Sequence, residues 1–374
     1  GSYTYTPTSA ARIAAGQAGA PAAAKQDQFT ITASNGQSST PVTITVPIGA
    51  VDQPVAGTPT VKQAYASTGA LYGNVGVVSQ YGLAYTVTSG PTNGGVVVYS
   101  PTGGFTYTPT AAARTAAGDP NAPASAKVDQ FTVTATNGVY STTQTVTVTI
   151  SPVITTDGSV TAASKYGWGT PNASVDFTSP ASLQGWGVYD GPGNAGYGVR
   201  TPDAISFANN VMTITGDAQG TTGGMAAPLG QQYGMWEVRM KVPVGAPGYS
   251  PVLLLWPDAE NWPTGGEVDF AEGTTDGSRQ TYSGALHYSA QDQWDPAVVG
   301  VDATQWHNYA VEWTPTKITY FIDGVPWKTY TDTSKFPPGP MHLAIQLDVH
   351  TLDLAGGATM QVAWARQYSL PTTV

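Results

Sequence analysis

Cysteine is missing altogether from this chain of 374 residues, and ionisable side chains are scarce. Without cysteine, the chain cannot form disulfide bonds or bind a metal through thiolates. Charged residues make up 10% of the sequence, well below the roughly one quarter that is usual in soluble proteins. Glycine, threonine, serine and tyrosine take their place, a composition that favours short strands joined by turns.

The few charges are divided unequally, with 24 acidic and 14 basic side chains and a net charge of −10. This balance disfavours binding to nucleic acid or to anionic membrane surfaces, and it argues against sulfated polysaccharides as partners. No apolar run approaches the roughly 20 residues of a membrane-spanning helix, so we expect no membrane span. No signal peptide opens the sequence, so we expect any targeting segment to lie outside it.

The motifs of several enzyme classes are also absent. The four histidines form no H-E-x-x-H pair, so zinc is not indicated. No G-x-S-x-G motif marks a serine hydrolase, and no glycine- and lysine-rich loop is present to bind phosphate. We therefore expect no cofactor and no metal site.

Acidic residues are concentrated in one stretch, GGEVDFAEG, which places Glu267, Asp269 and Glu272 within six positions. Along a β-strand, alternate side chains point to opposite faces, so Glu267 and Asp269 should share a face while the apolar residues between them enter a core. Glu272 would point inward on a regular strand. We predict a β-bulge near Phe270–Ala271 that returns Glu272 to the acidic face.

Three carboxylates in a row suit acid–base chemistry. Close like charges resist simultaneous ionisation, so one carboxyl keeps its proton near neutral pH. A pair with split pKa values is what nucleophilic and acid–base cleavage of a glycosidic bond requires. The alternatives are a solvated edge strand with repelling charges, or a calcium site, although calcium loops favour Asp, Asn and Gly on irregular backbone.

The pattern E-x-D-x-x-E, preceded by glycine and a Trp-Pro segment, resembles the active-site strand of glycoside hydrolase family 16. The resemblance implies a concanavalin-like jelly-roll β-sandwich and a retaining mechanism, with Glu267 as nucleophile, Asp269 as its assistant and Glu272 as acid/base. The spacing is similar to that of the laminarinase, agarase and carrageenase branches. The family's structural calcium lacks its usual aspartate, since Ala363 stands in that position.

Aromatic residues near the acidic strand are candidates for stacking on sugar rings, because sugars present flat apolar faces. We expect Trp256, Trp262 and Trp294 in this role, with core packing as the alternative, and the two remain evenly balanced for Trp256. His287, in ALHYS, could bond to the catalytic carboxylates or to a sugar hydroxyl, or be structural. Gln346 stands where many family members have asparagine, and we include it as a substrate contact. Mid-strand Trp236, Trp313 and Trp364 are expected in the core.

An internal repeat dominates the first part of the sequence. Residues 3–36 match residues 105–138 at a constant offset and without gaps. Each copy reads as strand, Asn-Gly turn and strand, and resembles cadherin-like VCBS repeats, which implies immunoglobulin-like sandwiches. We expect a partial repeat at 1–50 and a complete one at 51–152. The alanine-rich segments 10–24 and 112–126 contain Gly and Pro and are expected as loops, with a helical turn at most, rather than as full helices.

Residues 153–171 read as a linker, and 172–374 as a separate sandwich of about nine strands. Taken together, these features predict an all-β protein that acts as a secreted or cell-surface endo-β-glycanase on β-1,3- or mixed-linkage β-1,3/1,4-glucan. We expect a monomer whose partner is a polysaccharide. The alternatives are a carbohydrate-binding or adhesive surface protein on the same fold, and a transglycosylase with the same site.

Overall fold

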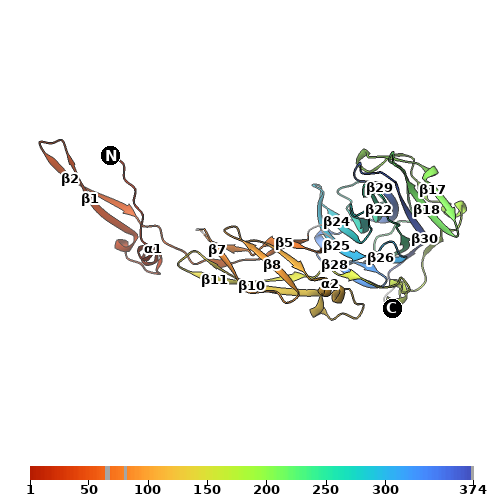
Figure 1. Cartoon of the computed structure of the whole chain (residues 1–374), viewed down its shortest axis with the longest axis horizontal. Coiled ribbons are helices and arrows are strands. Elements are labelled where there is room, and N and C mark those ends of the chain that lie inside the picture. The colour runs from red at the N-terminus through yellow and green to blue at the C-terminus, as the bar shows by residue number, and fades with distance from the viewer. Residues whose placement is uncertain (64–67, 80–81, 372–374) are drawn as a thin grey trace. The chain divides into compact units, whose positions relative to one another are not determined.

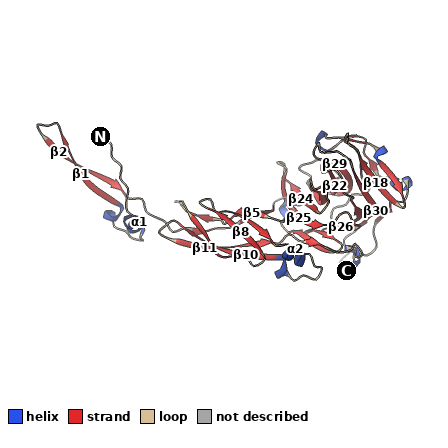
Figure 2. Ribbon diagram, viewed as in Figure 1, coloured by secondary structure: helices blue, strands red, loops and turns tan. Residues whose placement is uncertain are grey.

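The computed structural model describes residues 1–63, 68–79 and 82–371, shown in Figure 1. Strands and loops make up nearly all of this part of the chain, with a few short helices (Figure 2), so the predicted all-β class is confirmed. The chain divides into two compact units. The first contains Gly1–Val61, Tyr72–Tyr107 and Gln130–Val148, and the second contains Lys62–Leu71, Thr108–Asp129 and Thr149–Val374.

Both copies of the sequence repeat have the same local structure, a helix, a 3₁₀ turn and two antiparallel strands. In the first copy these are α1 (Ser9–Gly16), η1 (Ala22–Lys25), β1 (Gln26–Ser34) and β2 (Ser39–Pro47). In the second copy they are α2 (Ala111–Ala117), η2 (Ala124–Lys127), β10 (Val128–Thr136) and β11 (Ser141–Thr149).

The expectation of loops for the alanine-rich segments 10–24 and 112–126 was wrong at their starts, where α1 and α2 form. The cause is local capping. The hydroxyl of Thr8 or Thr110 accepts a hydrogen bond from the backbone N–H three residues later, at 3.1 Å in both copies. This bond satisfies one of the free N–H groups at a helix start, and alanine then favours continuation of the helix.

The two copies differ in how far their apolar strand face is covered. In the second copy Phe131 and Val133 are 1% and 0% exposed, whereas Ile31, which corresponds to Val133, is 46% exposed. In the second copy β10 pairs with β7 (Ala84–Ser89) as well as with β11, and the ring of Phe131 packs edge-on against Phe105 at 5.1 Å. Phe105 lies in a four-stranded sheet of β4 (Thr60–Gln63), β5 (Leu71–Asn74), β9 (Gly104–Pro109) and β8 (Gly94–Tyr99).

This difference gives a matched test within one molecule. Phe131→Ala should lower the free energy of unfolding of its domain by about 3–5 kcal/mol, the usual cost of emptying a buried phenylalanine site. Phe29→Ala, the equivalent change in the first copy, should cost clearly less because Phe29 is only partly buried. Hydrogen exchange of the two hairpins under increasing denaturant measures both losses. Equal losses would contradict a closed core in the second copy alone.

The second unit contains a β-sandwich, which we call the sandwich domain. In the described residues its inner sheet runs in the order β12 (Val153–Ile154), β25 (Gln293–Val301), β24 (Thr281–Tyr288), β23 (Glu267–Gly273), β22 (Tyr249–Pro257), β29 (Met341–Val349), β20 (Gly224–Ala226) and β14 (Gly187–Val188). Its outer sheet runs in the order β17 (Ile205–Ala208), β18 (Val211–Gly216), β30 (Ala358–Tyr368), β21 (Gly234–Lys241), β26 (His307–Trp313), β27 (Ile318–Ile322) and β28 (Val325–Tyr330), with β13 (Ala173–Asp176) also paired to β30.

The space between the two sheets is filled by one large apolar core. Trp236 and Trp313 are fully buried in it, which confirms their expected place. Trp364 is only partly buried and lies beside the guanidinium of Arg366, 5.1 Å from its ring, so its expected core position was wrong. Alternation in the sequence shows which residues share a face of a strand, but it does not show whether that face is the core or the outer face of the sheet. Longer side chains cover parts of that outer face.

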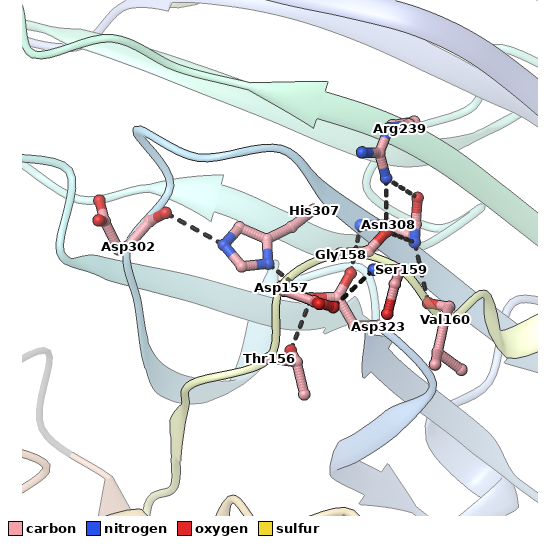
Figure 3. Close-up of polar contacts among 10 residues, drawn as sticks. All are labelled: Thr156, Asp157, Gly158, Ser159, Val160, Arg239, Asp302, His307, Asn308 and Asp323. Atoms are coloured by element: carbon pink, nitrogen blue, oxygen red, sulfur yellow. Dashed lines mark hydrogen bonds and ion pairs between the residues drawn. The ribbon is translucent and has the colours of Figure 1, made fainter.

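Where the sequence predicted a linker at 153–171, the structure shows two elements that pack on the sandwich domain. Strand β12 pairs in parallel with β25, and the short helix α3 (Ala162–Tyr166) buries Ala162 against the outer sheet. Figure 3 shows the polar contacts around the residues that join these two elements, from Thr156 to Val160. The side chain of Asn308 donates to the backbone oxygens of Gly158 and Val160, and Arg239 donates to Gly158 as well. Backbone groups of an irregular segment thereby find partners on the outer sheet.

Candidate active site

The acidic strand carries the predicted bulge. On one side of β23, Leu253 pairs with Ala271 and Leu254 with Asp269, so one residue is skipped. On the other side the register shifts between Asp269 and Glu272. Phe270 and Ala271 are both buried in the core, 0% and 1% exposed. The extra residue restores the phase of the strand after the bulge, and the predicted irregularity is confirmed.

Because of this bulge, Glu267, Asp269 and Glu272 all line one cavity of about 600 Å³ on the open face of the inner sheet. A second cavity of about 460 Å³ shares Glu272 and His287 with the first, so the two adjoin, and together we call them the groove. All three carboxylates line the first cavity, and Glu272 lines both. Adjoining cavities of this size can take a chain-like ligand that passes the carboxylates.

Burial and mutual repulsion shift the protonation of this group. Burial raises the pKa of Glu272 to about 8, and the negative charge of Asp269 adds to the effect. Burial also raises the pKa of Glu267 well above its usual value, again reinforced by Asp269. Two carboxyls that are held apart from water beside a third negative charge cannot both ionise easily, so the set retains a proton near neutral pH. This is the state that acid–base catalysis requires.

His287 lies opposite Glu267 on the neighbouring strand β24. Its Nε2 lies 3.4 Å from Oδ2 of Asp269 and its Nδ1 lies 2.7 Å from Oδ1 of Asp292. Burial lowers the pKa of His287, but the bond and charge of Asp269, then Asp292 and Glu267, outweigh burial and raise this pKa to about 10. A protonated imidazole therefore offsets part of the negative charge of the groove.

The predicted aromatic residues lie at two places along the groove. Trp256, at the end of β22, and Trp262 line the first cavity with nearly parallel rings, whose centroids are 6.4 Å apart. Trp294, on β25, lines the second cavity and stacks on His287 with centroids 6.2 Å apart. Trp262 and Trp294 are 42% and 47% exposed, so part of each side chain is accessible. Gln346 also lines the first cavity, and the structure brings all eight predicted site residues to one groove.

Several groove residues had not been predicted. Arg200, on β16 (Val199–Arg200), forms an ion pair with Asp348 on β29, with Nη2 2.6 Å from Oδ1. Tyr189 lies under the guanidinium of Arg200, at 5.0 Å from its ring centroid. His350 lies near the acidic strand, with Nε2 3.8 Å from Oε1 of Glu272.

Part of this set was present in the sequence as a pattern. Alternate residues from His342 on β29 to His350 just after it all line the groove, so the period of two that marks Gln346 also marks Asp348. Arg200 carries no such signal. Its segment forms only two-residue strands, and 148 positions separate it from its partner.

The ion pair between Arg200 and Asp348 should stabilise the groove wall. Asp348 is 3% exposed, so Arg200→Leu would leave a buried carboxylate without its counter-charge. Removing one partner of a buried pair typically costs about 3–5 kcal/mol. We expect urea unfolding of the sandwich domain to show a loss of this size. The double variant Arg200→Leu, Asp348→Asn should recover much of it, and an equal loss in both variants would exclude the ion pair as the cause.

In the described residues no group of three or more His, Asp or Glu side chains is arranged to hold a metal ion. A search of the same residues finds no helix both long and apolar enough to pass through a bilayer.

Comparisons with known proteins agree with this geometry. Residues 194–366 match the model of glycosyl hydrolases family 16. Crh-like protein 3 of Botryotinia fuckeliana is 24% identical over 208 residues, which cover 52% of this chain and 44% of that protein. A beta-glucanase of Rhodothermus marinus is 30% identical over 102 residues, which cover 24% of this chain and 35% of that protein. The chain thus spans less than half the length of these curated relatives.

Solved structures are similar over the same part of the chain. The laminarinase from Rhodothermus marinus is 21% identical, and the likeness covers 54% of this chain and 98% of that one with a TM-score of 0.48.

Proposed function

We propose that the sandwich domain, which is a glycoside hydrolase family 16 domain, acts as a retaining endo-β-glucanase on β-1,3- or mixed-linkage β-1,3/1,4-glucan. The observation that carries this proposal is the bulged strand β23, which brings three carboxylates to the lining of one cavity. Exposed tryptophans along the groove suit the flat faces of pyranose rings. The substrate class also draws support from two similar proteins that are named as a beta-glucanase and a laminarinase.

In this mechanism each carboxylate has one role. Glu267, ionised, attacks the anomeric carbon and forms a covalent glycosyl-enzyme. Glu272, protonated, gives its proton to the leaving oxygen and later takes one from the attacking water. Asp269 lies between them in the strand, 3.4 Å from Nε2 of His287, and its negative charge helps keep the proton on Glu272. The elevated pKa of Glu272 fits a general acid that works near neutral pH.

We place this activity outside the cell, with the polysaccharide as partner and a monomer as the working form. In this arrangement the two repeat copies serve as immunoglobulin-like spacers. The β1–β2 hairpin and the larger second copy support that role, since each is a small β-unit without a groove residue of its own.

Activity on laminarin and lichenan tests the assignment directly. Glu267→Gln and Glu272→Gln should each reduce reducing-sugar release by a factor of about 10² to 10⁴ or more, because each removes a group that acts in the transition state. Gln346→Ala, a groove substitution outside the carboxylates, should retain far more activity. Equal rates in the wild type and in Glu267→Gln would exclude this nucleophile.

The stereochemistry of the first product tests retention. Proton NMR of the fresh digest should show the β-anomer first, which then mutarotates to the α-anomer. Oligosaccharides longer than the substrate, at high substrate concentration, would indicate transglycosylation by the same site. Binding of glycan without any turnover at any pH would favour a carbohydrate-binding role instead.

The pH profile should report the carboxyl that donates the proton. Since the pKa of Glu272 is raised to about 8, kcat/KM should fall roughly tenfold per pH unit above that value as the acid loses its proton. The Ser283 hydroxyl lies 3.4 Å from Oε2 of Glu272 and lowers this pKa. Ser283→Ala should therefore move the basic limb to higher pH. A basic limb that is unchanged in Ser283→Ala would assign it to another group.

A further inference from the structure

The imidazole of His287 is held on three sides by different elements. Asp269 on β23 meets Nε2 at 3.4 Å, and Asp292, in the turn between β24 and β25, meets Nδ1 at 2.7 Å. The indole of Trp294 stacks on the ring face with an interplanar angle of 21°. A ring fixed at both nitrogens and one face has a single orientation, although His287 itself remains partly exposed to the groove.

The two carboxylates also determine the protons on the ring. An ionised carboxylate can only accept hydrogen bonds, so a favourable contact at each ring nitrogen requires an N–H at each. Neutral imidazole has only one N–H, and the second contact would then bring a lone pair against a negative oxygen. With both carboxylates in place, the ring is therefore the doubly protonated imidazolium.

We propose that Asp292 is a positioning residue, which holds His287 by Nδ1 so that its charged Nε2–H faces Asp269 in the catalytic row. This inference rests on the proposed function for its effect on catalysis, but the contact itself can be measured without any substrate. Asp292 touches neither the proposed nucleophile nor the proposed acid and acts only through His287. The arrangement parallels the way in which a buried carboxylate orients the histidine of a catalytic triad.

The charged and titratable groups around His287 come from three directions. Asp269, Glu267 and Glu272 face it from β23, Asp292 faces it from the turn, and His350, which follows β29, lines the same cavity. Burial lowers the pKa of His350, so this second imidazole adds little positive charge near neutral pH. The imidazolium of His287 thus faces the three carboxylates of β23. If His287 lost its proton, less positive charge would offset their negative charge.

The test compares Asp292→Asn with the wild type in the full chain. NMR of ¹⁵N-labelled histidine side chains reads the protonation and tautomer of His287 directly. We expect the wild-type ring to remain imidazolium through pH 8, and in Asp292→Asn we expect its titration to move down by about one unit. The shift should be moderate because the side chain of Asp292 is 38% exposed and water screens its charge.

Kinetics with laminarin form the second arm. At pH 6, kcat/KM of Asp292→Asn should stay near the wild-type value. At basic pH, it should fall roughly tenfold further below its pH 6 value than kcat/KM of the wild type does. Asp292→Glu, which keeps the charge, should restore most of the basic limb. Asp332→Asn is the matched control, since Asp332 is another turn aspartate, which accepts from Ser334 N–H at 3.2 Å and lies outside the groove.

Each outcome decides the proposal. An unchanged His287 titration in Asp292→Asn would overturn it, and so would a loss of activity that is equal at all pH values, because that pattern indicates general loosening of the turn. If the wild type hydrolyses no β-glucan, the proposed function fails while the NMR arm still decides the role of Asp292.

Discussion

Strand β23 has to satisfy two demands at once, and the bulge at Phe270–Ala271 is what reconciles them. Its apolar residues must enter the core between the sheets, since a gap there would be costly. Its three carboxylates must reach the opposite, solvated face. A regular strand of this sequence would bury Glu272 without a partner, at a cost of several kcal/mol. One additional residue places every side chain of the strand in the environment that suits it.

The bulge gathers negative charge, and the rest of the groove offsets it. His287 faces the acidic strand from β24, and Arg200 neutralises Asp348 on β29. These cations come from segments with very different backbone structure, a regular strand and a two-residue strand in a loop. Both cations reduce the repulsion between the carboxylates. The carboxylates can therefore lie close enough together to influence one another's pKa.

The placement of the three carboxylates could be predicted because it depends on local strand geometry. The alternation around Glu267 places side chains by strand geometry alone, and a three-residue step requires a bulge. Contacts between distant segments could not be predicted in this way. The pairing of Arg200 with Asp348 depends on how a loop folds over the sheet, which no periodicity records. Helix α2 was missed for a different reason, since a single threonine cap outweighed nearby glycine and proline.

Strand β12 has a further consequence for the behaviour of the sheet in solution. It pairs with β25, the strand that would otherwise leave a row of free backbone donors and acceptors at the margin of the inner sheet. Such margins are templates on which unrelated chains add strands and aggregate. Here β12 pairs with the last two residues of that edge, Gly300 and Val301, and the hydroxyl of Ser151 just before β12 donates to the backbone oxygen of Val298. Connecting chain thus covers one end of this edge against strand addition.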